Sequence, residues 1–186
     1  MDEAPVKAIS KLRYYQLAYL SKPACNRILF RAIRKNRVAS IMEIGIVDLK
    51  RSEQLIRLAA QSASQVRYTG VDLFEARTDE RSVVSLKEAH RVLKPCDCKL
   101  QLVPGDVHQA LTRVANAHLR TDLIVISAGY DPEQLEAAWF YVPRMLHAAS
   151  IVLVQPPDDP QAAYEMISRL EIERRVAHHA TTSQAA

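Results

Sequence analysis

Two acidic residues, Glu43 and Asp72, each stand at or near the end of a short apolar run that is typical of a buried strand. The first run is Ile41-Met42-Glu43-Ile44-Gly45 and the second is Val66-Arg67-Tyr68-Thr69-Gly70-Val71-Asp72. In an open parallel sheet, ligands bind outside the carboxyl ends of the strands, where an acid can accept hydrogen bonds from ribose hydroxyls. The two runs therefore predict a binding site for a ligand that carries a nucleoside.

The four glycines of the chain follow the same pattern, because each lies at or near the end of a predicted strand: Gly45, Gly70, Gly105 and Gly129. Glycine has no Cβ, so it lets the backbone turn sharply or approach a ligand closely. Tight turns between strands and helices would also use glycine. Because three of the four would line one carboxyl edge of a parallel sheet, their placement favours a binding edge.

The hydrophobic pattern supplies the elements that must position these residues. From Val38 onward, short runs rich in Val and Ile alternate with stretches of helical periodicity, as in βα units around a parallel sheet. We expect strands at 40–44, 67–72, 99–103, 122–127 and 150–155, and helices at 49–62, 79–93, 107–117, 132–146 and 160–174. Right-handed crossovers would place helices on both faces. The expected fold class is α/β: a Rossmann-like, doubly wound, mostly parallel sheet of at least five strands.

The length of 186 residues, with 48% apolar and 25% charged side chains, fits one ordinary globular unit. Helices expected at 5–20 and 24–34 would form an N-terminal helical cap at 1–37, followed by the Rossmann-like domain at 38–179. Residues 176–179 could add another strand, and we expect the tail at 180–186 to be disordered. Without a membrane-spanning stretch or a secretory signal, the predicted location is cytoplasmic, with no membrane partner.

The N-terminal helices are strongly basic. Between Lys7 and Arg37 there is no acid, and the basic residues are Lys7, Lys11, Arg13, Lys22, Arg27, Arg31, Arg34, Lys35 and Arg37. Tyr14, Tyr15 and Tyr19 are interleaved with them and would suit stacking on bases, so a nucleic-acid surface stays open as an alternative. Because Leu12, Tyr15 and Tyr19 recur at helical spacing, we expect the tyrosines to face the core and the cations to be solvated.

Cys96-Asp97-Cys98 is the one cluster of potential metal ligands in the sequence. No second pair of Cys or His stands at a spacing that completes four ligands. We expect reduced thiols at the surface, and no metal site.

Taken in order, four short motifs resemble those of a known family: Met42-Glu43-Ile44-Gly45, Tyr68-Thr69-Gly70-Val71-Asp72-Leu73-Phe74-Glu75, Val103-Pro104-Gly105-Asp106 and Asp122-Leu123-Ile124-Val125-Ile126. The family is the class I S-adenosylmethionine-dependent methyltransferases, particularly bacterial small-molecule O-methyltransferase-like members. The resemblance covers about residues 38–155. It implies S-adenosylmethionine as the cofactor and methyl transfer to a small molecule.

Carried over to this chain, the resemblance implies six cofactor-binding residues. Glu43 and Gly45 would lie beside the methionine and ribose end of the cofactor, and Asp72 would hold the ribose hydroxyls. Leu73 would pack on the adenine, and Asp106 would accept a hydrogen bond from the adenine amino group. Ser127, at the end of the fourth strand, would lie on the same edge. For each acid the alternative is a carboxylate that caps a helix or forms a turn.

The chain departs from the family pattern at two places. Val47 stands where a second glycine is common, although Ser52 could match a serine of some relatives. Relatives often end the fourth strand with an acid and a histidine, whereas this chain has Ser127-Ala128-Gly129-Tyr130. Neither Ser nor Tyr replaces a carboxylate as a base near neutral pH, so no catalytic residue is assigned.

Three functions remain open. The first is a methyltransferase whose acceptor is already nucleophilic, such as an amine or a thiolate. The second is a catalytically degenerate methyltransferase fold that serves as a binding or regulatory module. The third is an RNA-directed methyltransferase that uses the basic N-terminal helices.

Overall fold

The computed structural model describes residues 9–77 and 84–184, with side chains up to residue 178. A single sheet of six strands runs through its centre in the order β3-β2-β1-β4-β5-β6. The strands are β1 (Ser40–Ile44), β2 (Val66–Asp72), β3 (Cys98–Pro104), β4 (Leu123–Ile126), β5 (Ile151–Val154) and β6 (Glu165–Ile167). All neighbours pair in parallel except β5 and β6, which are antiparallel. The α/β, mostly parallel, Rossmann-like fold class is thus confirmed.

The strand register brings four carboxyl ends to one edge of the sheet. Ile44 of β1 pairs with Val71 of β2 on one side and with Ile126 of β4 on the other, while Asp72 pairs with Pro104 of β3. The strand order reverses beside β1, and such a switch point is where open α/β sheets bind ligands.

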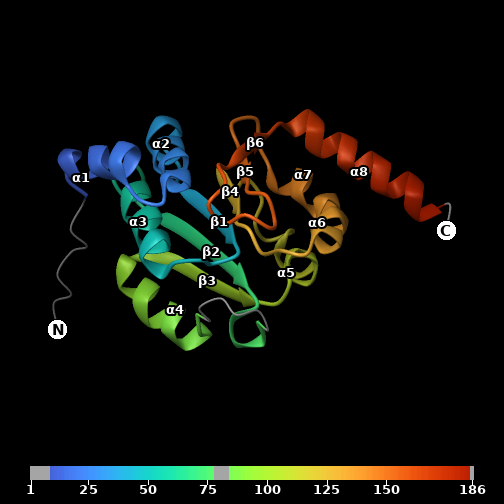
Figure 1. Cartoon of the computed structure of the whole chain (residues 1–186), viewed down its shortest axis with the longest axis horizontal. Helices are drawn as coiled ribbons and strands as arrows, with labels where there is room; N and C mark the ends of the chain where they lie inside the picture. The colour runs from blue at the N-terminus through green and yellow to red at the C-terminus, as the bar shows by residue number, and fades with distance from the viewer. Residues whose placement is uncertain (1–8, 78–83, 185–186) are drawn as a thin grey trace.

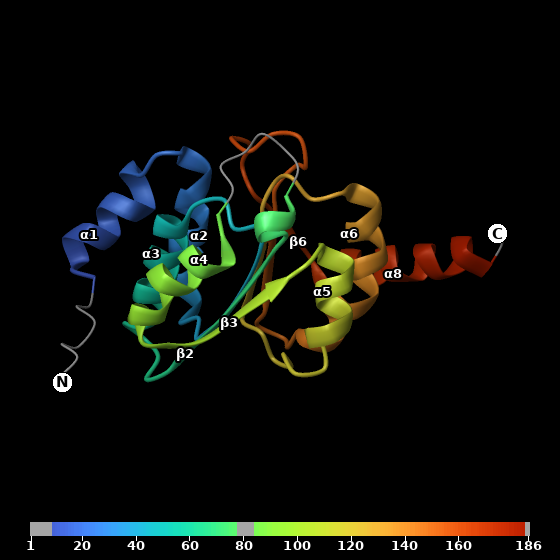
Figure 2. The ribbon, with the colours of Figure 1, turned by 90° about the horizontal axis from the view of Figure 1, so that it is seen from below.

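Helices cover both faces of the sheet, as Figure 2 shows. One face carries α2 (Arg27–Asn36), α3 (Leu49–Ala59) and α4 (Leu86–Leu93), and the other carries α5 (Val107–Val114), α6 (Pro132–Ala138), α7 (Val142–Met145) and α8 (Arg169–Gln184). Successive strand residues point to opposite faces, so Ile41 packs under the first group and Met42 under the second. Short turns of 3-10 helix complete the chain: η2 (Ala24–Asn26), η3 (Phe74–Ala76), η4 (Lys94–Cys96) and η5 (Trp139–Tyr141).

The N-terminal segment is helical as expected, but Tyr15 and Tyr19 do not face the core, whereas the partly buried Tyr14 packs against it. It comprises α1 (Lys11–Tyr15) and one stretch of π-helix, η1 (Gln16–Leu20), and residues 5–8 of the predicted helix lie outside the described residues. The helix buries Leu17 and Ala18 against the core, which places the stripe of Leu12, Tyr15 and Tyr19 on its outer face. The expectation that this stripe is buried was therefore wrong.

The C-terminal region differs most from the sequence-based expectation. The helix predicted at 160–174 is replaced by a turn, by β6, and by α8, which begins at Arg169. Val154 pairs with Glu165, so β6 covers the backbone groups that β5 would otherwise expose at the sheet edge. The strand predicted at 176–179 and the disordered tail over 180–184 were also wrong, because α8 continues to Gln184.

The cysteine pair is less accessible than expected, since Cys96 is buried and Cys98 is half-buried. Burial raises the pKa of the Cys96 thiol and raises that of Cys98 to about 11. Within the described residues, no group of three His, Cys, Asp or Glu side chains is placed to hold a metal ion. No helix in the same part of the chain is both long and apolar enough to cross a membrane.

Candidate functional site

A hollow opens at the carboxyl edge of the sheet, where β1, β2, β3 and β4 end. It contains about 470 Å³ of empty space, with the open solvent at its mouth included. Five of the six residues predicted from sequence line it: Gly45, Asp72, Leu73, Asp106 and Ser127. Glu43, the sixth, lies behind the wall of the hollow and is fully buried.

Gly45 fixes the turn at the end of β1. Its φ angle is +81°, and a Cβ there would meet the carbonyl oxygen of Ser127 at 3.3 Å. Its amide donates to the carbonyl of Val71 at 2.9 Å. The ends of β1, β2 and β4 therefore come together only because this position is a glycine.

Asp72 ends β2 and is held by three donors of the chain itself. Its Oδ2 accepts from the Ile46 amide at 2.7 Å and from Nη2 of Arg77 at 2.7 Å, and its Oδ1 accepts from the Phe74 amide at 2.9 Å. A carboxylate offers about four lone pairs, so one site on Oδ1 remains for a further donor. The predicted ribose acid thus lines the hollow, but Arg77 already partly neutralises its charge.

Glu43 has no exposed surface, and its carboxylate contacts three side chains. It forms an ion pair with Arg51, and its Oε2 accepts from the hydroxyls of Ser52 at 2.8 Å and Tyr68 at 2.6 Å. Burial and the adjacent carboxylate raise the pKa of Tyr68 well above its ordinary value. In this arrangement Glu43 is a structural anchor behind the hollow rather than part of its lining.

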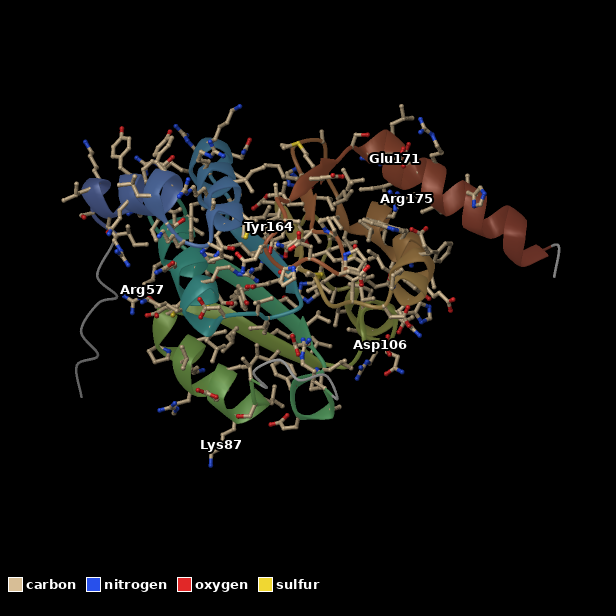
Figure 3. All side chains as sticks on the ribbon, viewed as in Figure 1. Arg57, Lys87, Asp106, Tyr164, Glu171 and Arg175 are labelled. Atoms are coloured by element: carbon tan, nitrogen blue, oxygen red, sulfur yellow. The ribbon has the colours of Figure 1, made fainter. Side chains whose placement is uncertain are left out.

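Arg51 is buried beneath the hollow, where it contacts side chains from several elements. Its Nη2 donates to Ser127 Oγ at 2.9 Å, its Nη1 donates to Tyr164 Oη at 2.9 Å, and these two hydroxyls lie 2.9 Å apart. Burial acts to lower the pKa of Arg51, but the Glu43 carboxylate together with Tyr164 and Tyr68 outweighs it, so the pKa is raised and the guanidinium stays charged. Figure 3 shows Tyr164 near the centre of the molecule, where the segment before β6 reaches this network.

Asp106 caps a helix and also lies at the hollow. Its Oδ1 accepts from the Gln109 amide at 2.8 Å and so caps the N-terminus of α5, and the residue also lines the hollow. Figure 3 shows it beside α5. Its carboxylate keeps lone pairs for a ligand in the hollow.

The segment after β4 carries a tyrosine and an acid whose polar groups already have hydrogen-bond partners in the chain. Tyr130 donates its hydroxyl to the Gln155 carbonyl at 3.0 Å, and burial raises its pKa. Asp131 lines the hollow, but its Oδ1 accepts from the Glu133 amide at 2.9 Å and caps α6. Asp131, the acid nearest to the end of the fourth strand in the sequence, therefore caps a helix.

The sequence did not point to Arg51, Tyr68, Arg77 or Tyr164 as parts of the site. Arg51 carried one usable signal, because it lies at helical spacing with the apolar residues Leu55 and Leu58, on the side of α3 that is buried. A cation on a buried helix face requires an anionic partner. Tyr164 carried no such signal, since it lies 113 residues from Arg51 in the chain.

Comparisons with known proteins agree with this architecture. No protein-family model and no curated protein sequence matches the chain. Among solved structures, an O-methyltransferase from Bacillus cereus in complex with SAH matches with a TM-score of 0.51 at 14% identity, over 95% of this chain and 72% of that one.

Two further solved structures match in the same way. One is the O-methyltransferase TomG from Streptomyces achromogenes, involved in tomaymycin synthesis and in complex with SAM, with a TM-score of 0.50 at 13% identity, over 97% of this chain and 72% of TomG. The other is a cofactor-bound protein from MTB, with a TM-score of 0.51 at 16% identity, over 91% and 75% of the two chains. At these identities the matches show a shared fold.

Proposed function

From the class I methyltransferase fold of this chain, we propose that it binds S-adenosylmethionine at the carboxyl edge of its sheet and transfers the methyl group to a small molecule. One observation carries the proposal: five residues assigned from sequence to the cofactor converge on a single hollow at the switch point of the sheet. These residues come from four separate strand ends that are distant in sequence and meet because the strands are parallel.

The hollow fits the nucleoside half of the cofactor best. Asp72 keeps one acceptor site for a ribose hydroxyl, and Asp106 keeps lone pairs for an adenine amino group. Leu73, which directly follows Asp72 in the sequence, also lines the hollow and supplies an apolar surface for a base. The methionine half has fewer partners, because Glu43 is buried and paired with Arg51.

When bound, the cofactor supplies an activated methyl group, so the protein needs mainly to position the acceptor and exclude water. After β4 the hollow is lined by Ser127, Tyr130 and Asp131. Ser127 and Tyr130 are not bases near neutral pH, and Asp131 already caps α6. We therefore propose an acceptor that is already nucleophilic, such as an amine or a thiolate.

A second candidate is a methyltransferase fold that binds a nucleoside without catalysis. The observation in its favour is that two of the three predicted cofactor acids have cationic partners within the chain, Arg51 for Glu43 and Arg77 for Asp72. A ligand must compete with these partners, which favours a smaller ligand such as adenosine over the whole cofactor.

Isothermal titration with S-adenosylmethionine, S-adenosylhomocysteine and adenosine tests both candidates. The first predicts binding of S-adenosylmethionine that Asp72→Asn weakens about tenfold, from the roughly 1–3 kcal/mol lost when a buried polar partner is removed. Asp97→Asn is the matched control, because Asp97 is exposed and remote from the lining of the hollow.

The outcomes separate the candidates. Binding of S-adenosylmethionine together with methylation of members of an amine and thiol panel supports the methyltransferase. Adenosine binding without methyl transfer supports the second candidate. No binding of any of the three ligands at millimolar concentration overturns both.

A further inference from the structure

The outer face of α1 and η1 presents large side chains to solvent. Leu12 is 80% exposed, Tyr15 59%, Tyr19 51% and Leu20 71%. These residues stand at the end of the molecule opposite the C-terminus of α8, as Figure 1 shows. They do not line the hollow at the sheet edge, so the proposed function leaves them unexplained.

The aromatic rings on this face are arranged as a stacked array. The rings of Tyr15 and Tyr19 are 6.0 Å apart between centroids, with an interplanar angle of 21°. Tyr14 adjoins them, with its centroid 5.4 Å from that of Tyr15 at 58°. Tyr15 and Tyr19 are exposed, and exposed aromatic rings provide sites on which bases can stack.

Arginines of α2 lie over these same rings. The guanidinium carbon of Arg31 is 6.0 Å from the ring centroid of Tyr19, and that of Arg34 is 5.8 Å from the centroid of Tyr14. Arg34 also donates to Gln61 Oε1 at 3.3 Å, which holds it against α3. Cations and rings thus alternate across one surface instead of forming separate charged and apolar faces.

A groove beside the rings has no acid among its described lining residues. It contains about 550 Å³ of space, open solvent included, and its lining residues are Lys11, Tyr14, Tyr15, Arg34 and Gln61. On the opposite side of the helix, a second groove has Asp48 as its single acidic lining residue among those described, and that carboxylate caps α3 by accepting from the Lys50 amide at 2.9 Å. Positive charge therefore dominates both flanks of the ring array.

We propose that Tyr14, Tyr15, Tyr19, Arg31 and Arg34, here called the N-terminal surface, bind single-stranded nucleic acid. Bases would stack on the tyrosine rings, and phosphates would contact the arginines and the lysine of the adjoining groove. The alternation of base and phosphate along a single strand matches the alternation of ring and cation on the protein. This inference does not depend on the proposed function of the hollow.

Two other occupants fit the surface less well. A membrane would have to bury the guanidiniums of Arg31 and Arg34 along with the rings beneath them, which carries a desolvation cost. A second copy of the chain in a symmetric contact would bring like charges together, because residues 7–37 contain no acid. A polyanion with planar bases satisfies both the charge and the rings.

Fluorescence anisotropy with labelled twelve-nucleotide oligo(U) and oligo(dT) tests the inference on the full chain between 50 and 200 mM salt. We expect Tyr15→Ala with Tyr19→Ala to weaken binding about tenfold or more, since each stacked base contributes roughly 1–3 kcal/mol. Tyr15→Phe with Tyr19→Phe should retain binding. Arg31→Gln with Arg34→Gln should reduce the salt dependence by about 0.7 per lost phosphate contact.

Phe140 and Arg144 provide a matched control, because Arg144 lies 5.1 Å from the centroid of the 55% exposed Phe140 ring on another part of the molecule. Phe140→Ala with Arg144→Gln should bind as the unmodified chain does. Preference between oligo(U) and oligo(dT) assigns the nucleic acid as RNA or DNA.

Absence of binding at 50 mM salt, or equal binding by the tyrosine-to-alanine variant, overturns the inference. Binding to vesicles of phosphatidylserine and phosphatidylcholine that is lost in that variant, without oligonucleotide binding, assigns the surface to a membrane. Concentration-dependent dimerisation lost in the same variant, again without oligonucleotide binding, assigns it to a second copy. Because Tyr15 and Tyr19 are exposed, these variants should fold, and circular dichroism checks this.

Discussion

The guanidinium of Arg51 lies against the carboxylate of Glu43, and both side chains are buried directly behind the proposed cofactor hollow. Glu43 belongs to β1 and Arg51 to α3, so the pair ties the sheet edge to the helix that follows it. Ser127 extends the contact to β4 by accepting from Arg51. A position assigned by resemblance to the cofactor is thus used to hold three elements together.

Removing the cation from this pair should destabilise the fold strongly. We expect Arg51→Met to lower the free energy of unfolding by about 3–5 kcal/mol, because it leaves the Glu43 carboxylate buried without a charge partner. The measurement is urea denaturation followed by circular dichroism. Arg57→Met is the control, since the Arg57–Glu53 pair is half-exposed, and it should cost at most about 1 kcal/mol.

The double substitution Glu43→Gln with Arg51→Met should be less destabilising than Arg51→Met alone, since no unpaired charge then remains. Equal stability of Arg51→Met and the unmodified chain would show that water or another group compensates Glu43. In that case the pair would not be the anchor described above.

Arg77 should compete with a ligand for Asp72. Nη2 of Arg77 donates to Oδ2 of Asp72 at 2.7 Å, and Arg77 also lines the hollow. Arg77→Gln should therefore make the Asp72 carboxylate more available to a ribose. We expect adenosine to bind about three- to tenfold more tightly, which corresponds to roughly one hydrogen bond. Isothermal titration measures this, with the exposed Arg91→Gln as control. Weaker binding by Arg77→Gln would instead make Arg77 a ligand contact.

The positions of the hollow residues could be predicted because they depend on the local pattern. Strand residues alternate between faces, and parallel strands end at a common edge, so apolar runs that end in Gly45, Asp72 and Ser127 converge once the sheet forms. The same reasoning gave the bounds of β1 correctly. This reasoning does not depend on which helix packs against which strand.

The hydrogen bond between Arg51 and Tyr164 could not be predicted, because it depends on packing between distant segments. Arg51 reaches Tyr164 across 113 residues, and nothing in the sequence around Tyr164 marks it as a partner. The prediction that Tyr15 and Tyr19 are buried was wrong for a related reason. Periodicity identifies a stripe on a helix, but only tertiary structure decides whether that stripe or the opposite one is buried.

Protonation of Asp122 should lower the stability of the fold at low pH. Burial acts to raise the pKa of Asp122, but hydrogen bonds from Ala39, Ser40 and His147 outweigh it and lower the pKa. Because the pKa is lower in the folded than in the unfolded chain, this stabilisation is fully present above about pH 4 and is lost as the pH falls further. Asp122→Asn should therefore show a weaker loss of stability between about pH 5 and pH 2.

Urea denaturation at several pH values measures this effect. Asp97→Asn serves as the control because Asp97 is exposed, and its curve should follow that of the unmodified chain. Parallel curves for Asp122→Asn and the unmodified chain would contradict the prediction and assign the acid sensitivity to other carboxylates.

A side chain at position 105 should harm both the fold and the hollow. Gly105 has a φ angle of +133°, which L residues rarely adopt, and a Cβ there would approach Nη2 of Arg113 to 2.7 Å. Arg113 is flexible and can move, so the backbone strain dominates, and Gly105→Ala should lower the free energy of unfolding by about 1–3 kcal/mol. Gly105→Ala with Arg113→Ala should recover little of this loss, since it relieves the contact but not the strain. Thermal unfolding of both variants tests the prediction, and full recovery in the double variant would show that the contact, rather than the φ angle, requires glycine here.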